Sequence, residues 1–194
     1  MTQSAATAKA DRARPRGEPT STVTVRALDD LARLTAPEAE ALYRRSGMPE
    51  RMDQLDGDLV GRMLALRGTR GVVLGALAGF ARSSGFPWGG KSFSARDAST
   101  GNGINRVHLG GRHRLFPFRT RFGASVIDGG PAVVLDYDDP DNPGFIRAIH
   151  DEVREVSPGL YFGPACWKSA GGGTTTLLWF GLDTRGVARA ARPS

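Results

Sequence analysis

WGGKSFSA, residues 88–95, belongs to a series of short segments that the residue pattern predicts to be β-strands. Turns rich in Gly, Asn or Asp separate these segments. The other members are GDLVGRMLAL, INRVHL, LFPFRTRFGAS, AVVLDYD, LYFGPACWKS and TTTLLWFGLD, at residues 57–66, 104–109, 115–125, 132–138, 160–169 and 174–183. Seven or so strands at regular spacing predict a mainly β protein, folded as an antiparallel barrel that is closed or nearly closed.

Helices are predicted at the front of the chain and before the last two strands. N-terminal apolar residues recur at helical spacing: Leu31, Leu34, Ala39, Leu42 and Tyr43. Thr35 is placed to cap the second of two short helices there. The segment NPGFIRAIHDEVREVSPG, residues 142–159, is predicted to be one helix. Its apolar stripe consists of Ile146, Ile149, Val153 and Val156.

The segment TRGVVLGALAGFARSS, residues 69–84, has two interpretations. Its valine pair favours a strand, whereas Gly71, Gly75 and Gly79 recur every fourth residue and favour a helix packed closely against a barrel end. A helix lying on a membrane surface is the alternative. The longest apolar run, residues 72–81, is too short to span a bilayer, so no membrane insertion is predicted.

The chain of 194 residues is long enough for one domain with a buried core. We predict a single barrel domain over residues 25–184, between disordered tails at 1–24 and 185–194. The N-terminal segment lacks the apolar region of a secretory signal, and a cytoplasmic location is expected. The single cysteine, Cys166, excludes an internal disulfide and a cysteine-based metal cluster.

The formal net charge of +6 raises the question of a polyanionic partner. Much of the excess charge lies near the two ends of the chain. Arginines mixed with aromatic residues also occur in one central segment, at Arg112, Arg114, Arg119 and Arg121. Such a mixture is what a nucleic-acid groove needs. Because an arginine-rich composition has other origins, nucleic-acid binding is the least favoured of the alternatives.

The acidic segment LDYDDPDNPG, residues 135–144, does not fit a calcium-binding EF-hand loop, because a proline occupies the fifth loop position. A structural role is favoured for its later residues, with Asn142 as the cap of the helix predicted to follow. Asp136 and Tyr137 differ, since they end an apolar strand. Side chains alternate along a strand, so one of the two points into the barrel. They are candidates for ligand binding or catalysis.

The second candidate constellation is GFPWGGKSF, residues 85–93, where glycines surround Trp88 in a crowded turn. An inward-facing Lys91 could bind a carboxylate or an enolate, or act as a base. Candidate ligand-binding residues are Trp88, Asn105, Phe116, Phe118, Arg119, Tyr161, Trp167 and Trp179. Strand alternation means that not all of them face inward. The histidines have no metal-ligand spacing and no dinucleotide fingerprint is present, so neither a metal nor a cofactor is predicted.

At FPWGGKSF, GINRV, VLDYDDPDNPGFIRAIHDEVREVSPGLYFG and LLWFGLD the chain resembles a bacterial family of lipocalin-like, calycin-type β-barrels. The resemblance implies a barrel that holds a hydrophobic small molecule. The related nitrobindins bind haem through a Gly-x-Trp-x-Gly-x-Gly element and a late histidine. Here Ser92 replaces the final glycine and the last histidine, His150, precedes the closing hairpin, so haem is not predicted.

Three functional hypotheses follow. The first is a barrel that binds a polyketide- or lipid-like molecule and catalyses its cofactor-free cyclisation or isomerisation in a bacterial biosynthetic pathway. Asp136 would then be the base, and Tyr137 or Lys91 the hydrogen-bond donor. The second is a carrier or sensor without chemistry, with no acid in its interior and Asp136 paired to arginine at the rim. The third is nucleic-acid binding through the central arginines.

Overall fold

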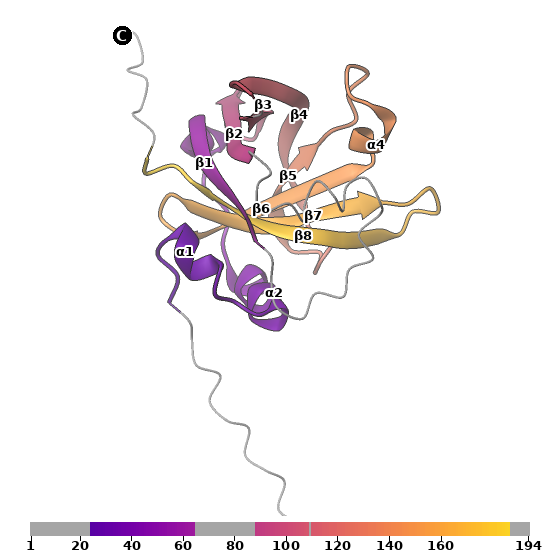
Figure 1. Cartoon of the computed structure of the whole chain (residues 1–194). Coiled ribbons are helices and arrows are strands. Elements are labelled where there is room, and N and C mark those ends of the chain that lie inside the picture. Colours follow the sequence, from indigo (N-terminus) through magenta and orange to yellow (C-terminus); the bar gives the residue numbers. More distant parts are fainter. Residues whose placement is uncertain (1–23, 65–87, 109, 187–194) are drawn as a thin grey trace, which may run out of the picture.

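The computed structural model of the protein describes residues 24–64, 88–108 and 110–186 (Figure 1). The two interpretations of residues 69–84 fall outside the described residues, as do nearly the whole of the N-terminal tail and most of the C-terminal one. None of the helices within the described ranges has the length and hydrophobicity needed to cross a membrane.

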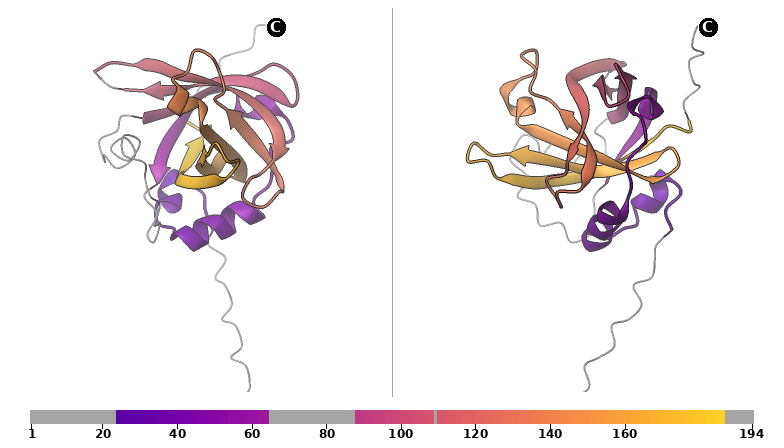
Figure 2. Two further views of the ribbon diagram at one scale, coloured as in Figure 1. Left: turned by 90° about the vertical axis from the view of Figure 1, so that its right-hand side faces the viewer. Right: turned by 180° about the vertical axis from the view of Figure 1, so that it is seen from behind.

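Within these ranges, eight antiparallel strands pair in sequence order, and the last pairs with the first to close a barrel (Figures 1 and 2). The strands are β1 Gly57–Leu64, β2 Trp88–Ala95, β3 Thr100–Val107, β4 His113–Ala124, β5 Pro131–Asp136, β6 Ile149–Ser157, β7 Leu160–Lys168 and β8 Thr174–Asp183. The mainly β barrel predicted from the sequence is therefore confirmed, and it is fully closed.

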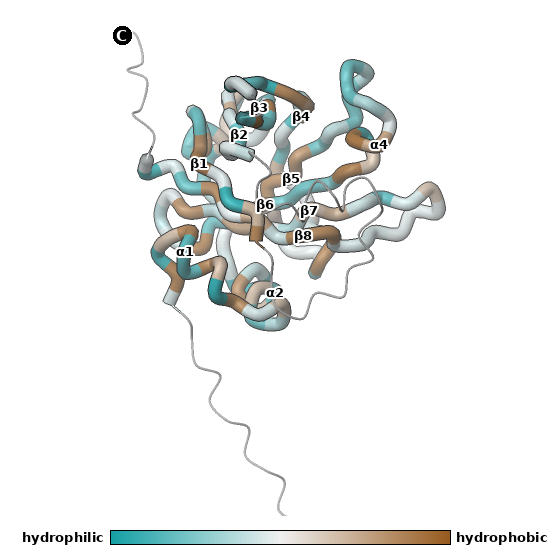
Figure 3. The backbone as a smooth tube through the Cα atoms, in the orientation of Figure 1, coloured by the Kyte–Doolittle hydropathy of each residue, from teal (hydrophilic) through white to brown (hydrophobic). Residues whose placement is uncertain are grey.

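The barrel interior is filled by alternate residues of the strands. Along β5 the side chains of Val133 and Leu135 belong to the inner cluster, and Tyr137 continues this alternation just beyond the strand. Other buried members of the inner cluster are Leu59, Phe93, Phe118, Val153, Tyr161, Phe180 and Leu182. Figure 3 shows apolar residues, in brown, recurring among polar ones along the strands. The spacing of Val133, Leu135 and Tyr137 has the period of two that one buried face of a pleated strand requires.

The N-terminal helices α1 (Leu28–Leu31) and α2 (Ala36–Arg45) cover the outside of the barrel wall near β7 and β8 (Figure 1). The predicted cap Thr35 precedes α2, and its backbone N–H and hydroxyl both donate to the Glu38 carboxylate at 2.7 Å. The helices bury a second apolar cluster against the outward side chains of the two strands. Its buried members include Leu31, Leu42, Tyr43, Leu160, Phe162 and Trp179.

The helix predicted over residues 142–159 is much shorter in the structure. Helix α4 spans only Gly144–Arg147, after the loop that follows β5, and β6 takes up Ile149–Ser157. The apolar residues that fit a helical stripe also fit a strand, with Ile149 and Val153 facing the inner cluster and Val156 packing on the outer one. β-Branched residues favour strands. Pairing with β5 and β7 on both sides outweighs the local helical pattern.

Asn142 does not cap α4 with its side chain. Pro143 is the residue before the helix, and no side chain makes a capping hydrogen bond there. The Asn142 amide Nδ2 instead donates to the carbonyl oxygens of Pro117 at 2.8 Å and Tyr137 at 2.9 Å. This buried amide therefore joins the loop after β5 to β4, which helps to hold Tyr137 in position.

Candidate functional site

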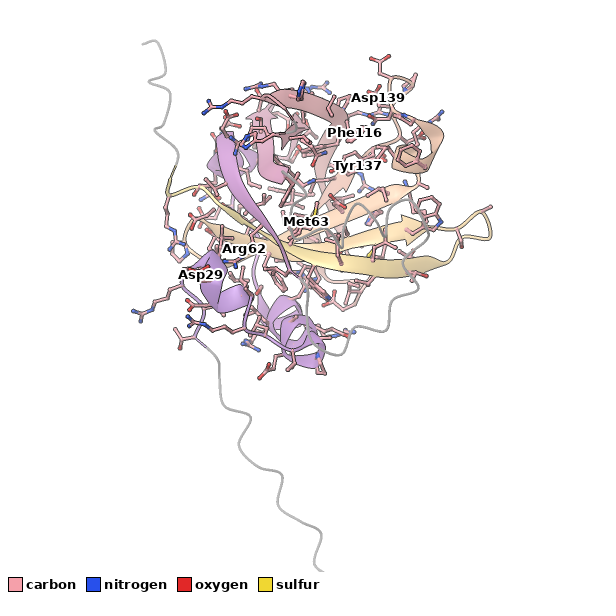
Figure 4. All side chains as sticks on the ribbon, in the orientation of Figure 1. Asp29, Arg62, Met63, Phe116, Tyr137 and Asp139 are labelled. Atoms are coloured by element: carbon pink, nitrogen blue, oxygen red, sulfur yellow. The ribbon has the colours of Figure 1, made fainter. Side chains whose placement is uncertain are left out.

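A pocket in the barrel encloses about 680 Å³ of space, part of which is open to solvent. Its lining is mostly apolar, with a small polar group contributed by Lys91, Asn105, Tyr137 and Asp151. The apolar lining residues are Met63, Trp88, Val107, Phe116, Ile146, Ile149, Ala165, Leu177, Leu178 and Phe180. Figure 4 labels three lining residues, Met63, Phe116 and Tyr137. An apolar cavity with few convergent polar groups is typical of a small-molecule site.

Lys91, on β2, is at the centre of the polar group and is 2% exposed. Its ammonium nitrogen donates to Oδ2 of Asp151 at 2.9 Å, to Oδ1 of Asn105 at 2.8 Å and to the Tyr137 hydroxyl at 2.5 Å. Asp151 comes from β6 and is 4% exposed. The three acceptors match the three N–H donors of a protonated lysine. Lys91 and Asp151 therefore form a buried ion pair within a hydrogen-bonded network.

The other members of the network hold one another in place. The Tyr137 hydroxyl donates to Oδ2 of Asp151 at 2.9 Å. The Asn105 amide Nδ2 donates to the Tyr137 hydroxyl oxygen at 3.1 Å and to the backbone oxygen of Phe116 at 3.2 Å. The indole N–H of Trp88 donates to Oδ1 of Asn105 at 3.1 Å. Residues from four parts of the chain thus form one connected cluster, which we call the Lys91 network: Trp88, Lys91, Asn105, Tyr137 and Asp151.

Aromatic rings surround the lysine charge. Its nitrogen lies 5.1 to 5.5 Å from the ring centroids of Trp88, Phe118, Tyr137 and Phe180. The faces of such rings attract a cation. Burial lowers the pKa of Lys91, while the Asp151 charge and hydrogen bond act to raise it. Burial, and next the Asp151 charge, raise the pKa of Tyr137 well above its usual value, so this phenol stays protonated.

Close backbone packing brings Trp88 over the pocket. Gly90 has a φ of +116°, and a Cβ there would lie 2.1 Å from the carbonyl oxygen of Leu59 on β1. A Cβ on Gly61 would lie 2.6 Å from the Trp88 ring. The pairing of β2 with β3 shifts register between Trp88 and Gly90. Only glycine fits at position 90, where φ is positive and the backbone of β1 is this close. This crowding agrees with the crowded turn predicted around Trp88 from the sequence.

Phe116 enters the pocket lining through an irregularity in β4. Its φ is +59°, a left-handed conformation that is uncommon for a residue with a side chain. The pairing of β3 with β4 shifts register here, because Ile104 faces Pro117 and Asn105 faces Leu115, which leaves Phe116 without a ladder partner. Such a bulge changes the direction of a side chain. The backbone strain, about 1–3 kcal/mol for a conformation of this kind, is retained beside the site.

Asp136 and Arg119, two further candidates, do not line the pocket. Strand alternation turns Tyr137 inward and Asp136 outward, where its carboxylate lies 3.6 Å from the Lys168 ammonium. The side chain of Asp136 is 37% exposed. The exposed Arg119 guanidinium donates to the backbone oxygen of Asp138 at 2.6 Å. Of the pair Asp136 and Tyr137, the structure therefore brings only the tyrosine to the pocket.

The remaining candidates fall into two groups. Phe118 and Tyr161 are buried in the inner cluster and Trp167 packs against it, but none of these three belongs to the pocket lining. Trp179 faces out of the barrel, where its ring stacks on Phe162 at 5.0 Å and meets the edge of Tyr43 at 5.6 Å. Five of the candidate catalytic and ligand-binding residues predicted from the sequence thus meet at the pocket: Trp88, Lys91, Asn105, Phe116 and Tyr137.

Asp151 is the site residue that the sequence pattern did not indicate. It lies within the segment predicted as a helix, where it would be on a polar face. A period of two through Ile149, Asp151 and Val153 would have placed it inward between two apolar residues. Its side chain is unusual in another respect, since Oδ1 is buried and has no hydrogen-bond partner among the described residues. Such an atom is costly in an apolar interior.

The three histidines lie away from the pocket lining. His150, on the outer face of β6, places Nε2 2.8 Å from Oε1 of Glu152. His108 and His113 are exposed. Across the described ranges, no three His, Cys, Asp or Glu side chains come together in a way that could hold a metal ion.

A crystal structure of a protein from Thermomonospora curvata is similar to this chain. The TM-score is 0.51 at 25% sequence identity, covering 77% of this chain and 86% of that one. No family model and no curated protein matches the chain. The likeness to the solved structure concerns the fold. Membership of the lipocalin-like family therefore stays a prediction from the sequence motifs.

Proposed function

We propose that the protein binds an apolar small molecule in the barrel pocket, with the polar part of the ligand directed at the Lys91 network. The observation that carries this proposal is the combination of an apolar lining with one buried ion pair. A closed barrel is compatible with such a role. Replacing a buried ion pair by apolar residues is often neutral or stabilising, so stability alone gives little reason to keep one in the interior.

Catalysis is the second candidate function, and it is favoured by Oδ1 of Asp151, which has no hydrogen-bond partner in the described ranges. In a cofactor-free isomerisation or cyclisation, this oxygen would accept a proton from a C–H or O–H bond of the substrate. The electron pair of that bond would stay on the substrate and form the new double or single bond, while an existing double bond of the substrate would break and leave its electron pair on another atom. The proton would then return to another substrate atom. Asp151 takes the role of base that the sequence pattern assigned to Asp136.

The carrier alternative receives mixed support. It predicts an interior without an acid, whereas Asp151 is buried among the pocket residues. It also predicts Asp136 paired with an arginine at the rim, whereas the cation that lies near the Asp136 carboxylate is the Lys168 ammonium. Of the arginines behind the nucleic-acid alternative, Arg114 contacts Asp58 and Arg119 contacts the Asp138 backbone. These contacts favour a structural role for both arginines.

Native mass spectrometry of the purified protein, followed by organic extraction, tests the proposal. The matched variants are Asp151→Asn in the pocket and Asp136→Asn at the rim. Ligand binding predicts a co-purifying apolar molecule on the wild type and on Asp136→Asn. Catalysis adds that Asp151→Asn retains a substrate which the other two proteins have converted. The same molecule on all three proteins would support carriage, an empty pocket in all of them would oppose binding, and extracted nucleic acid would favour the third alternative.

A further inference from the structure

We infer that the pocket selects an apolar ligand whose polar head is a neutral hydrogen-bond donor, such as a hydroxyl or an amide N–H, over a carboxylate or a ketone. This inference rests on the proposed binding function and specifies its ligand class. Its basis is the hydrogen-bonding capacity of the Lys91 network: in the described part of the chain, one oxygen of the network, Oδ1 of Asp151, has no hydrogen-bond partner.

The donors of the network are all engaged. Lys91 uses its three N–H bonds on Asp151, Asn105 and Tyr137. Asn105 uses both N–H bonds of its amide, and the Tyr137 hydroxyl uses its one O–H bond on Asp151. The indole N–H of Trp88 is used on Asn105. A ligand carbonyl or carboxylate would therefore have to displace an existing buried hydrogen bond to obtain a donor.

The acceptors of the network are engaged too, with one exception. Oδ1 of Asn105 accepts from Trp88 and Lys91, and the Tyr137 oxygen accepts from Lys91 and Asn105. Oδ2 of Asp151 accepts from Lys91 and Tyr137. Each of these oxygens thus has two donors, which fills its usual capacity. Oδ1 of Asp151 has none within the described residues, although it is buried and Asp151 lines the pocket.

Charge favours a neutral head group. The Lys91 ammonium and the Asp151 carboxylate balance each other at 2.9 Å, so the network has no net charge left for an ionic ligand. A carboxylate head would face the partnerless oxygen of another carboxylate in an apolar pocket, where like charges repel strongly. A hydroxyl or amide N–H would instead donate to a charged acceptor, which makes a stronger hydrogen bond than a neutral acceptor does.

Isothermal titration calorimetry at neutral pH with four matched naphthalene probes tests the inference. The probes are 2-naphthol, 2-acetonaphthone, 2-naphthoate and 2-methylnaphthalene, which share the ring and differ in the head group. We expect 2-naphthol to bind about tenfold more tightly than 2-methylnaphthalene, because one charge-assisted hydrogen bond is added. The ketone is expected to bind no better than 2-methylnaphthalene, and the carboxylate more weakly still.

The double variant Lys91→Met/Asp151→Leu is the control, because it removes both charges together and leaves no buried ion unpaired. Its folding is checked by circular dichroism. We expect the affinities of this variant for 2-naphthol and 2-methylnaphthalene to be about equal, because the carboxylate that 2-naphthol uses is gone. A preference that survives in this variant would overturn the inference. Tightest binding of the ketone or the carboxylate to the wild type would also overturn it, while leaving the proposed function intact. Failure of all four probes to bind would contradict both.

Discussion

The ammonium nitrogen of Lys91 lies 2.9 Å from Oδ2 of Asp151, although 60 residues separate the two along the chain. Both side chains are almost fully buried, and aromatic rings surround the cation. A buried pair of this kind contributes little net stability as a pair, but the loss of one partner is costly. The contact between β2 and β6 therefore places two opposite charges side by side in the pocket lining.

The single variant Lys91→Met is expected to lower the free energy of unfolding by about 3–5 kcal/mol, because it leaves the Asp151 carboxylate buried without its cation. The double variant Lys91→Met/Asp151→Leu is expected to recover most of this loss. Urea denaturation of the wild type and both variants measures the difference. Equal destabilisation in the single and double variants would show that the two charges do not act as a pair.

Phe116 provides a test of the bulge in β4. Phe116→Gly is expected to be more stable than Phe116→Ala by up to about 1 kcal/mol, because glycine adopts a φ of +59° without strain. The exposed residue Arg121 on the same strand is the matched position, and there alanine is expected to be the more stable of the two. Thermal denaturation of the four variants measures both comparisons. The same order at both positions would contradict a left-handed Phe116.

Tryptophan fluorescence separates the pocket from the outer wall. Trp88 lines the pocket, whereas Trp179 packs under α2 outside the barrel. We expect the fluorescence change caused by a non-absorbing ligand such as 1-octanol to be much smaller in Trp88→Phe and to persist in Trp179→Phe. Titration of the wild type and the two variants checks this. If the change instead depends on Trp179, the ligand does not occupy this pocket.

A second buried polar network joins α2 to the barrel. The Tyr43 hydroxyl donates to Oε2 of Glu152 at 2.6 Å, and the Val126 backbone N–H donates to Oε1 at 2.6 Å. Burial alone would raise the pKa of Glu152, but hydrogen bonds from His150, Ser125 and Tyr43 outweigh it and lower the pKa. The carboxylate is thus ionised and depends on its donors.

Tyr43→Phe is accordingly expected to cost about 1–3 kcal/mol of unfolding free energy, because a buried carboxylate loses one donor. Urea denaturation measures this loss. Arg33→Ala, which removes an exposed side chain near the same helix, is the control and is expected to change stability by less than about 0.5 kcal/mol. Probe binding in the pocket is expected to be unaffected by either change.

The ion pair between Asp128 and Arg154 is expected to make part of the folding stability depend on pH in acid. The Arg154 guanidinium donates to its carboxylate at 2.6 and 2.9 Å, and lowers its pKa from 3.8 to about 2. Between these values the unfolded chain binds more protons than the folded one. Stability from this pair is therefore complete above about pH 4 and is lost as the pH falls towards about 2. The difference in unfolding free energy between wild type and Asp128→Asn is expected to shrink over that window, and a constant difference would contradict the pairing.

The sequence by itself determined the barrel class and all the strands except β6, which its apolar spacing predicted to be helical. Alternating apolar residues separated by glycine and asparagine turns predicted β2, β7 and β8 at nearly their observed bounds. It also determined that one residue of Asp136 and Tyr137 faces inward, because the side chains of a strand alternate. Two further features could be predicted because each depends on residues that are neighbours in the sequence. They are the crowded glycines beside Trp88 and the cap of α2 at Thr35.

Only the tertiary structure decided which candidates meet. The partner of Lys91 is Asp151, which is distant in sequence and lies in a segment whose apolar spacing fits a helix and a strand equally. The pairing of β6 with β5 on one side and β7 on the other resolves that ambiguity, and no local pattern contains it. Trp179 faces outward because α2 supplies an apolar surface outside the wall. Contacts across the barrel arise from closure, so the pocket exists only once β8 pairs with β1.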